Sequence, residues 1–228
     1  MAAPAESARA PVFAERPTEL IVREGLVLGI LPLALAGVAG MLGWLPAAYV
    51  LLGLGVFLAA FFRNPSREVP DDEGTVVAPA DGRVVAVGEI ERPDGSKALR
   101  IGIFLSVFNV HVNRSPVSGR VVSIERAGDR YLAAFDRRAE HANARCTMLL
   151  ETEDGLQVPV VQITGLIARR IVCHPRVGEW VRRGDRYGMI RFGSRTDVVL
   201  PADAEVLVRR GERVRGGSSQ IARLGVGA

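Results

Sequence analysis

The sequence predicts a mainly β protein whose body is preceded by an N-terminal apolar helical hairpin. Three observations support this fold class: a nearly charge-free stretch near the N-terminus, a series of short β-rich runs after it, and a small internal repeat among those runs. The chain has 228 residues, of which 48% are hydrophobic and 24% charged. That length and composition suit one substantial packed domain with a small appendage, not a disordered chain.

The N-terminal region divides into a polar arm, residues 1–24, and an almost charge-free stretch, residues 25–62. Gly43-Trp44-Leu45-Pro46 interrupts the apolar stretch at its middle, which predicts two helices of about 18 residues, each roughly 27 Å long. That length is marginal for spanning a bilayer core, and neither helix has a polar face. A membrane-associated hairpin is therefore expected, with a hairpin buried in a soluble core as the alternative.

Basic residues flank this hairpin, with Arg16 and Arg23 before it and Arg63 and Arg67 after it. The excess of positive charge on cytoplasmic flanks then predicts that both ends lie on the cytoplasmic face of the cell membrane. Whether the hairpin crosses the bilayer or sits in one leaflet stays open.

Residues 63–228 form the predicted β-rich domain, in which short runs such as 83–87, 99–105 and 120–124 alternate with Gly, Pro and Asp turns. The segment 178–184 (Gly-Glu-Trp-Val-Arg-Arg-Gly) recurs as 211–217 (Gly-Glu-Arg-Val-Arg-Gly-Gly). A second pair, 79–84 and 116–121, places a turn before a strand in both copies. Together these units resemble a barrel-sandwich of the lipoyl/biotinyl type.

Composition removes several classes of function. The net charge of +4 suits anionic partners, namely nucleic acid, acidic substrates or an anionic membrane surface, and a solvated basic surface is the alternative. Of these partners, nucleic acid is not expected. Cys146 and Cys173 have neither metal-ligand spacing nor a disulfide framework, so no metal is expected. The single lysine, Lys97, lies in a turn without the methionines of a biotin site, which makes a carrier protein a poor second interpretation.

The step Gly193-Ser194 is a candidate for self-cleavage. Glycine leaves its carbonyl open to attack and tolerates a strained backbone, so Ser194 Oγ could attack the Gly193 carbonyl in an N-to-O acyl shift. β-Elimination and hydrolysis would then leave a pyruvoyl group at residue 194. Gly-Ser also occurs at 95–96 and 217–218, so the step alone is a weak signal and an ordinary turn serine is the alternative.

The motifs around this step resemble those of the phosphatidylserine decarboxylases, in particular their short bacterial and archaeal branch. The resemblance covers about residues 25–228, and the motifs occur in the family's order: Phe-Phe-Arg-x-Pro at 61–65, Pro-Ala-Asp-Gly at 79–82, Phe-Leu-Ser-x-x-x-Val-His-Val-Asn-Arg-x-Pro at 104–116, Gly-Leu-Ile-Ala-Arg-Arg-Ile at 165–171 and Arg-Phe-Gly-Ser-Arg at 191–195.

The resemblance implies a membrane enzyme that decarboxylates phosphatidylserine to phosphatidylethanolamine through a Schiff base on a pyruvoyl cofactor made from Ser194. It implies cleavage between Gly193 and Ser194 into residues 1–193 and 194–228, which stay together as a heterodimer. His111 and Asp81 would be the acid/base partners of Ser194 in a triad-like arrangement.

Arg169 and Arg170 are expected to face the anionic head group, or else solvent. A homo-oligomer is left open.

Alternatives remain at each point. Asp81 before Gly82 suits an ordinary turn, and His111 in an apolar run suits a core histidine. Longer family members have a second histidine where this chain has Arg114, and whether His111 alone serves both processing and decarboxylation stays open. A membrane-tethered, non-enzymatic adaptor that stays intact, or a pyruvoyl decarboxylase of a soluble amino acid, are the competing functions.

Overall fold

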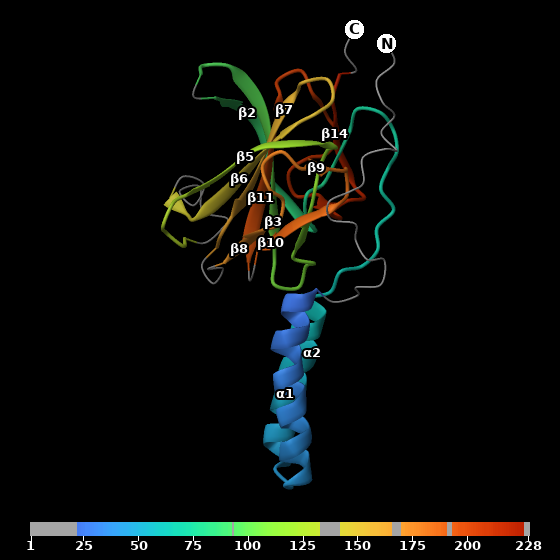
Figure 1. Cartoon of the computed structure of the whole chain (residues 1–228), viewed down its shortest axis with the longest axis vertical. Coiled ribbons are helices and arrows are strands. Elements are labelled where there is room, and N and C mark those ends of the chain that lie inside the picture. Colours follow the sequence, from blue (N-terminus) through green and yellow to red (C-terminus); the bar gives the residue numbers. More distant parts are fainter. Residues whose placement is uncertain (1–21, 93, 133–141, 166–169, 191–192, 226–228) are drawn as a thin grey trace.

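The computed structural model describes residues 22–92, 94–132, 142–165, 170–190 and 193–225. Figure 1 shows a curled β body from which two helices project as a stalk. The helices are α1 (Arg23–Met41) and α2 (Leu45–Phe61). The strands are β1 (Thr75–Val77), β2 (Gly82–Glu91), β3 (Lys97–Leu105), β4 (Val112–Arg114), β5 (Gly119–Ala127), β6 (Arg145–Glu151), β7 (Gln157–Ile163), β8 (Ile171–Cys173), β9 (Trp180–Val181), β10 (Arg186–Ile190), β11 (Ser194–Pro201), β12 (Glu205–Val206), β13 (Arg213–Val214) and β14 (Gln220–Arg223).

The predicted apolar hairpin is confirmed, with its turn at Gly43, whose φ of +75° suits a residue without a side chain. The helices pack closely at Gly55, where a Cβ would lie 2.5 Å from Leu33 Cδ2. Beyond that contact the hairpin exposes apolar side chains along its length, and Trp44 at the tip is 66% exposed. Within the described ranges, neither helix combines the length and hydropathy needed to cross a membrane.

The body is built around one large antiparallel sheet that curls into a half-barrel, with strand order β13-β2-β3-β11-β7-β6-β5-β9. Two smaller sheets, β1-β14-β12 and β4-β10-β8, complete it. The main core fills the inside of the curled sheet with residues such as Ile101, Leu150 and Val198. The predicted mainly β, barrel-sandwich body is confirmed.

The internal repeat corresponds to a repeated structural unit. In each copy the first glycine of the turn donates its N–H to a valine carbonyl, and the last glycine donates to the residue before a Pro-x-x-Gly turn. The pairs are Gly178 to Val121, Gly184 to Ser115, Gly211 to Val84 and Gly217 to Ala78, all at 2.8 Å. Residues 79–84 therefore occupy the place in one copy that residues 116–121 occupy in the other.

Strand β11 lies near the middle of the large sheet, paired with β3 on one side and with β7 on the other. Its first residue, Ser194, is opposite Leu105.

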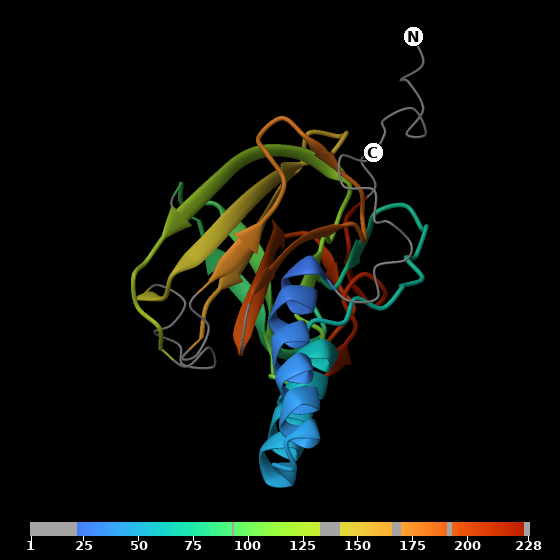
Figure 2. The same cartoon turned by 60° about the horizontal axis from the view of Figure 1, so that its bottom comes forward.

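A second apolar cluster lies where the hairpin meets the body, and it joins Phe61 and Phe62 to Val110, Val112 and Met189. Figure 2 shows the hairpin leaving the β body, with α2 joining the body at the end of the helix that carries Phe61.

Candidate active site

Ser194 is completely buried at the start of β11, and its Oγ has no hydrogen-bond partner among the described residues. A buried hydroxyl without a partner costs free energy, so such a group calls for an explanation in terms of strain or chemistry. Gly193 before it has a φ of +64°, a conformation that side-chain-bearing residues rarely adopt. A Cβ at Gly193 would meet no described atom within 4 Å, so the demand here comes from the backbone conformation and not from crowding.

His111 is also fully buried, directly before β4. Its Nδ1 lies 2.9 Å from the carbonyl oxygen of Asn109. Because a carbonyl can only accept, Nδ1 must carry the proton, which leaves Nε2 as an acceptor. Nε2 has no partner among the described residues. The imidazole is therefore fixed in the tautomer that a general base requires.

The surroundings keep this imidazole neutral. Burial lowers the pKa of His111 from 6.5 to about 4, and the nearby positive charge of Arg63 acts in the same direction. The bond to the Asn109 carbonyl opposes the shift but does not cancel it. On the other side, the ring of Phe61 stacks on the imidazole with centroids 4.0 Å apart. At neutral pH His111 can accept a proton.

A chain of polar contacts links the segments that carry these two groups. Asn113, two residues after His111, donates to Thr196 Oγ1 at 3.4 Å, and Thr196 is two residues after Ser194. Gln162 of β7 donates to Asn113 Oδ1 at 2.8 Å and so fixes the amide. Strand β4 and the start of β11 are therefore in side-chain contact. The hydroxyl of Ser194 and the Nε2 acceptor of His111, both without partners in the described part of the chain, lie on these two contacting segments.

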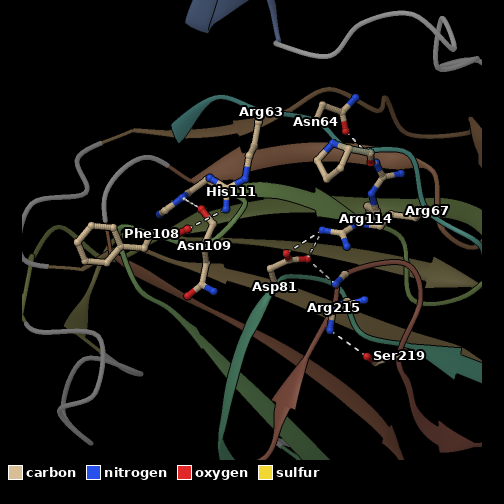
Figure 3. Close-up of polar contacts among 12 residues, drawn as sticks. Arg63, Asn64, Arg67, Asp81, Phe108, Asn109, His111, Arg114, Arg215 and Ser219 are labelled. Carbon is tan, nitrogen blue, oxygen red and sulfur yellow. Dashed lines mark hydrogen bonds and ion pairs between the residues drawn. The ribbon is translucent and has the colours of Figure 1, made fainter. Parts of the chain in front are cut away.

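Asp81 has different partners from those of a triad carboxylate. It accepts from Arg67 at 2.7 and 2.9 Å and from the backbone N–H of Gly216 at 2.8 Å. Figure 3 shows Asp81 with Arg67 and Arg215 in one group, and His111 with Asn109 and Arg63 in another. Within the described part of the chain, no hydrogen bond joins Asp81 to His111, because the Asn109 carbonyl occupies the orienting position on Nδ1.

The internal repeat explains the bond to Gly216. In the other copy, Ser118 occupies the place of Asp81, and its Oγ accepts from the N–H of Arg183 at 3.0 Å. Both side chains thus close the same turn. Asp81 differs in adding an ion pair with Arg67, whose side chain, like that of Asp81, is mostly buried.

Arg114 is buried and binds the segment that follows the hairpin. Its guanidinium donates to the Asn64 side chain at 2.8 Å, to the Pro65 carbonyl at 3.1 Å and to the Gly184 carbonyl at 2.9 Å. With Arg63 bound to the Phe108 carbonyl and Arg67 bound to Asp81, residues 63–67 contact both groups of Figure 3.

Of the two arginines expected to face the head group, the structure describes only Arg170. Arg169 lies outside the described residues. Arg170 is exposed and directly precedes β8, whose first residue, Ile171, pairs with Ile190. Since Met189 pairs with Val112, the start of β8 and the segment of His111 lie at the same end of the small sheet.

Sequence reasoning missed three contributors: Phe61, Asn109 and a buried ion pair directly after Ser194. In that pair Arg195 donates to both oxygens of Asp197, at 2.6 and 2.8 Å. Burial raises the pKa of Asp197, while Arg195 opposes the shift. The opposite charges at 195 and 197, two residues apart beside an apolar run, could have predicted this ion pair, because buried charges are seldom found unpaired.

Comparison with known proteins gives a consistent match. The family model described as phosphatidylserine decarboxylase matches residues 54–222. A phosphatidylserine decarboxylase proenzyme of Symbiobacterium thermophilum is 49% identical over 207 residues, which cover 90% of this chain and 96% of the relative. The proenzyme of Pelobacter propionicus is 51% identical over 78% of this chain and 81% of its own. That of Geobacter sulfurreducens is 44% identical, over 86% and 90%.

Proposed function

Because this chain belongs to the phosphatidylserine decarboxylase family, we propose that it converts phosphatidylserine to phosphatidylethanolamine with a pyruvoyl group made from its own Ser194. The observation that carries the proposal is the Gly193-Ser194 step at the start of β11. There a buried hydroxyl, without a hydrogen-bond partner among the described residues, lies on a segment in contact with that of a neutral histidine. The proenzyme names of the relatives agree with a chain that matures by cleavage.

Self-cleavage would begin with His111 Nε2 accepting the Ser194 hydroxyl proton, directly or through a water molecule. The freed Oγ attacks the Gly193 carbonyl carbon, the peptide C–N bond breaks as the nitrogen takes the proton from His111, and an ester joins the two residues. Loss of the Ser194 α-proton then expels the Gly193 carboxylate and leaves a dehydroalanine. One water molecule enters and one ammonia leaves as residue 194 becomes pyruvoyl.

The site fits this group. A pyruvoyl residue has no more heavy atoms than the serine from which it forms, so the enclosed position of Ser194 can hold it. Strand β11 pairs with β3 along the whole register from Ser194 to Pro201, which keeps the new chain end in the sheet after the bond to Gly193 is cut. When formed, the group supplies a carbonyl that takes up the electron pair released by loss of carbon dioxide.

The remaining residues prepare the site for the lipid. Phe61 and burial keep His111 neutral, so it can exchange protons during turnover as well as processing. Arg170, exposed at the same end as His111, is proposed to attract the anionic head group, and Arg169 is proposed with it. Asp81 is proposed to support the site through Arg67 and the turn at Gly216.

The exposed apolar side chains of the hairpin are proposed to anchor the protein in the cytoplasmic face of the cell membrane. That anchoring would bring the enzyme to a substrate that is itself part of the bilayer. The partners then proposed are phosphatidylserine and the two chains 1–193 and 194–228, held together as a heterodimer.

The test is an assay of purified full-length protein on vesicles that contain phosphatidylserine, with Ser194→Ala as the control. We expect phosphatidylethanolamine and carbon dioxide in equal amounts from the wild type and neither from the variant. Free serine, offered in parallel, addresses a soluble amino-acid substrate. Ethanolamine from serine without turnover of the lipid would overturn the proposed substrate, and turnover of neither would overturn the enzymatic assignment.

A further inference from the structure

We propose that the turn formed by residues 106–110, between β3 and β4, is a second membrane contact that inserts Phe108 into the boundary between lipid head groups and acyl chains. This inference rests on the proposed function, because it assumes that the hairpin is seated in a lipid surface. It adds a site at which the β body itself meets the membrane, next to the candidate base.

Phe108 is 76% exposed although the turn that carries it is well fixed. Its carbonyl accepts from Arg63 at 2.8 Å. The turn is closed by Asn109, whose Oδ1 accepts from the N–H of Ser106 at 2.9 Å and from its hydroxyl at 2.7 Å. The aromatic ring is therefore held outward by a defined backbone and is not at the tip of a frayed loop. A large apolar ring presented in this way suits a binding surface.

The ring lies beside the hairpin root. Arg63 directly follows Phe62, and Phe61 and Phe62 pack with Val110 in one apolar cluster. Figure 3 shows the Phe108 ring directed away from both Asp81 and Arg67. Phe108 is therefore held next to the end of the hairpin through the bond from Arg63 to its carbonyl.

A lipid surface is the occupant that these features favour. The hairpin exposes large apolar side chains on both helices, including Ile30 and Leu31 of α1 and Tyr49 and Val50 of α2. An apolar environment that covers them must therefore surround the hairpin on all sides. An acyl-chain phase does this. A large apolar ring beside a basic side chain suits a membrane interface, where the ring enters the head-group boundary and the basic group meets anionic lipid.

The placement has a consequence for the site. Asn109, the neighbour of Phe108, holds His111 through its carbonyl. A lipid contact at Phe108 is therefore three residues from the candidate base, while the turn itself is held by Asn109 and Arg63 and does not depend on the ring. This would set the site at the level of the head groups, where the bond to be broken lies.

The experiment measures the membrane depth of a tryptophan introduced by Phe108→Trp. This substitution is made in full-length protein together with Trp44→Phe and Trp180→Phe, so that one tryptophan remains. Vesicles of phosphatidylcholine and phosphatidylserine carry bromine either near the head group or deep in the chains. Val177→Trp in the same background is the control, since Val177 is also exposed, at 63%, in the turn that leads into β9, away from the hairpin in Figure 1.

We expect the emission of the Phe108→Trp protein to shift to the blue and to be quenched more by shallow bromine than by deep bromine, while the emission of the Val177→Trp control is unaffected. No quenching of the Phe108→Trp protein when it is bound to vesicles would overturn the inference. A blue shift that follows protein concentration and not lipid would assign the surface to a second copy of the chain and would also overturn it.

A kinetic arm separates this inference from the proposed function. Phe108→Ala removes the contact of the ring with lipid and should raise KM for vesicle-borne phosphatidylserine roughly three- to tenfold, as expected for partial burial of one aromatic ring. The same variant should leave kcat within about twofold. Turnover of dispersed short-chain phosphatidylserine should not change. If no variant decarboxylates either lipid, the proposed function has failed, whereas turnover with an unchanged KM would count against the contact at Phe108.

Discussion

The imidazole of His111 lies against the ring of Phe61, with ring centroids 4.0 Å apart and ring planes inclined by 28°. Phe61 is the last residue of α2, so the apolar hairpin reaches directly into the surroundings of the candidate base. The end of the hairpin thus helps to exclude water from the imidazole.

Replacing Phe61 should change the pH dependence of self-cleavage. In the wild type the pKa of His111 is lowered to about 4, so its neutral form should support a rate that is level near pH 7 and falls only as the pH approaches 4. Phe61→Ala admits water, favours the charged imidazole and should move this fall toward pH 6.5. Rates of fragment appearance from pH 4 to 8 check this. Phe61→Leu, which keeps an apolar cover, is the control, and identical profiles for all three proteins would contradict it.

The same histidine should make the fold sensitive to acid. Its pKa in the folded state is below that in the unfolded state, so the unfolded chain binds a proton first as pH falls. Stability should decline from pH 6.5 downward, by up to about 3 kcal/mol once the pH is below 4. Denaturant unfolding of Ser194→Ala and of Ser194→Ala/His111→Gln at pH 7 and 4.5 tests this. The double variant should lose less stability between the two pH values, and equal losses would exclude His111 as a source.

The pairing of Asp81 with Arg67 can be separated from any role in cleavage. Arg67→Ala leaves a mostly buried carboxylate with the Gly216 N–H as its remaining partner among the described residues, and should lower the free energy of unfolding by about 1–3 kcal/mol. Adding Asp81→Asn should recover part of this loss, with a coupling of about 1–2 kcal/mol in the double-mutant cycle. A coupling near zero would contradict the ion pair.

Cleavage rates of the same variants address the triad. If Asp81 acts through the turn and Arg67, all three variants should still cleave, at rates that follow their stability. A block confined to the proteins that carry Asp81→Asn would instead restore Asp81 as a direct partner in the reaction.

Gly102 of β3 should be intolerant of any side chain. A Cβ there would lie 2.8 Å from Arg195 Nε and 2.8 Å from Asp197 Oδ1, and so would push apart the ion pair that directly follows Ser194. Gly102→Ala should therefore destabilise by about 3 kcal/mol. Gly88→Ala in β2, where a Cβ meets nothing within 4 Å, should stay within about 0.5 kcal/mol of the wild type. Thermal unfolding compares them, and equal effects would contradict the explanation.

The sequence was informative where a property is local. An apolar stretch without a polar face, broken at Gly43, predicted the hairpin, and a recurring Gly-x-x-Val-x-x-Gly unit predicted paired turns. Strand β11 begins at Ser194, ahead of its apolar run 198–200, and the polar residues Arg195 and Asp197 are accommodated there because they pair with each other within the sheet.

What the sequence could not provide are contacts between distant segments. Nothing near Asp81 predicts its bond to Gly216, 135 residues away, although alignment of the two repeat pairs would have matched Asp81 with Ser118 and indicated a turn function. The orienting group on His111 is a backbone carbonyl, which any residue at 109 possesses, so residue type carried no signal. The stacking of Phe61 depends on where the hairpin docks.

The central claim is that Ser194 cleaves its own chain and becomes the carbonyl cofactor. Intact mass of purified, membrane-reconstituted protein tests it most directly, before and after a carbonyl-trapping reagent, with Ser194→Ala alongside. We predict two pieces, residues 1–193 and 194–228, the smaller about 3.8 kDa as its share of 24.5 kDa, with the trapped carbonyl on the smaller piece and an uncut variant. A single wild-type chain of 24.5 kDa that takes up no reagent would contradict the account and favour an intact, membrane-tethered adaptor.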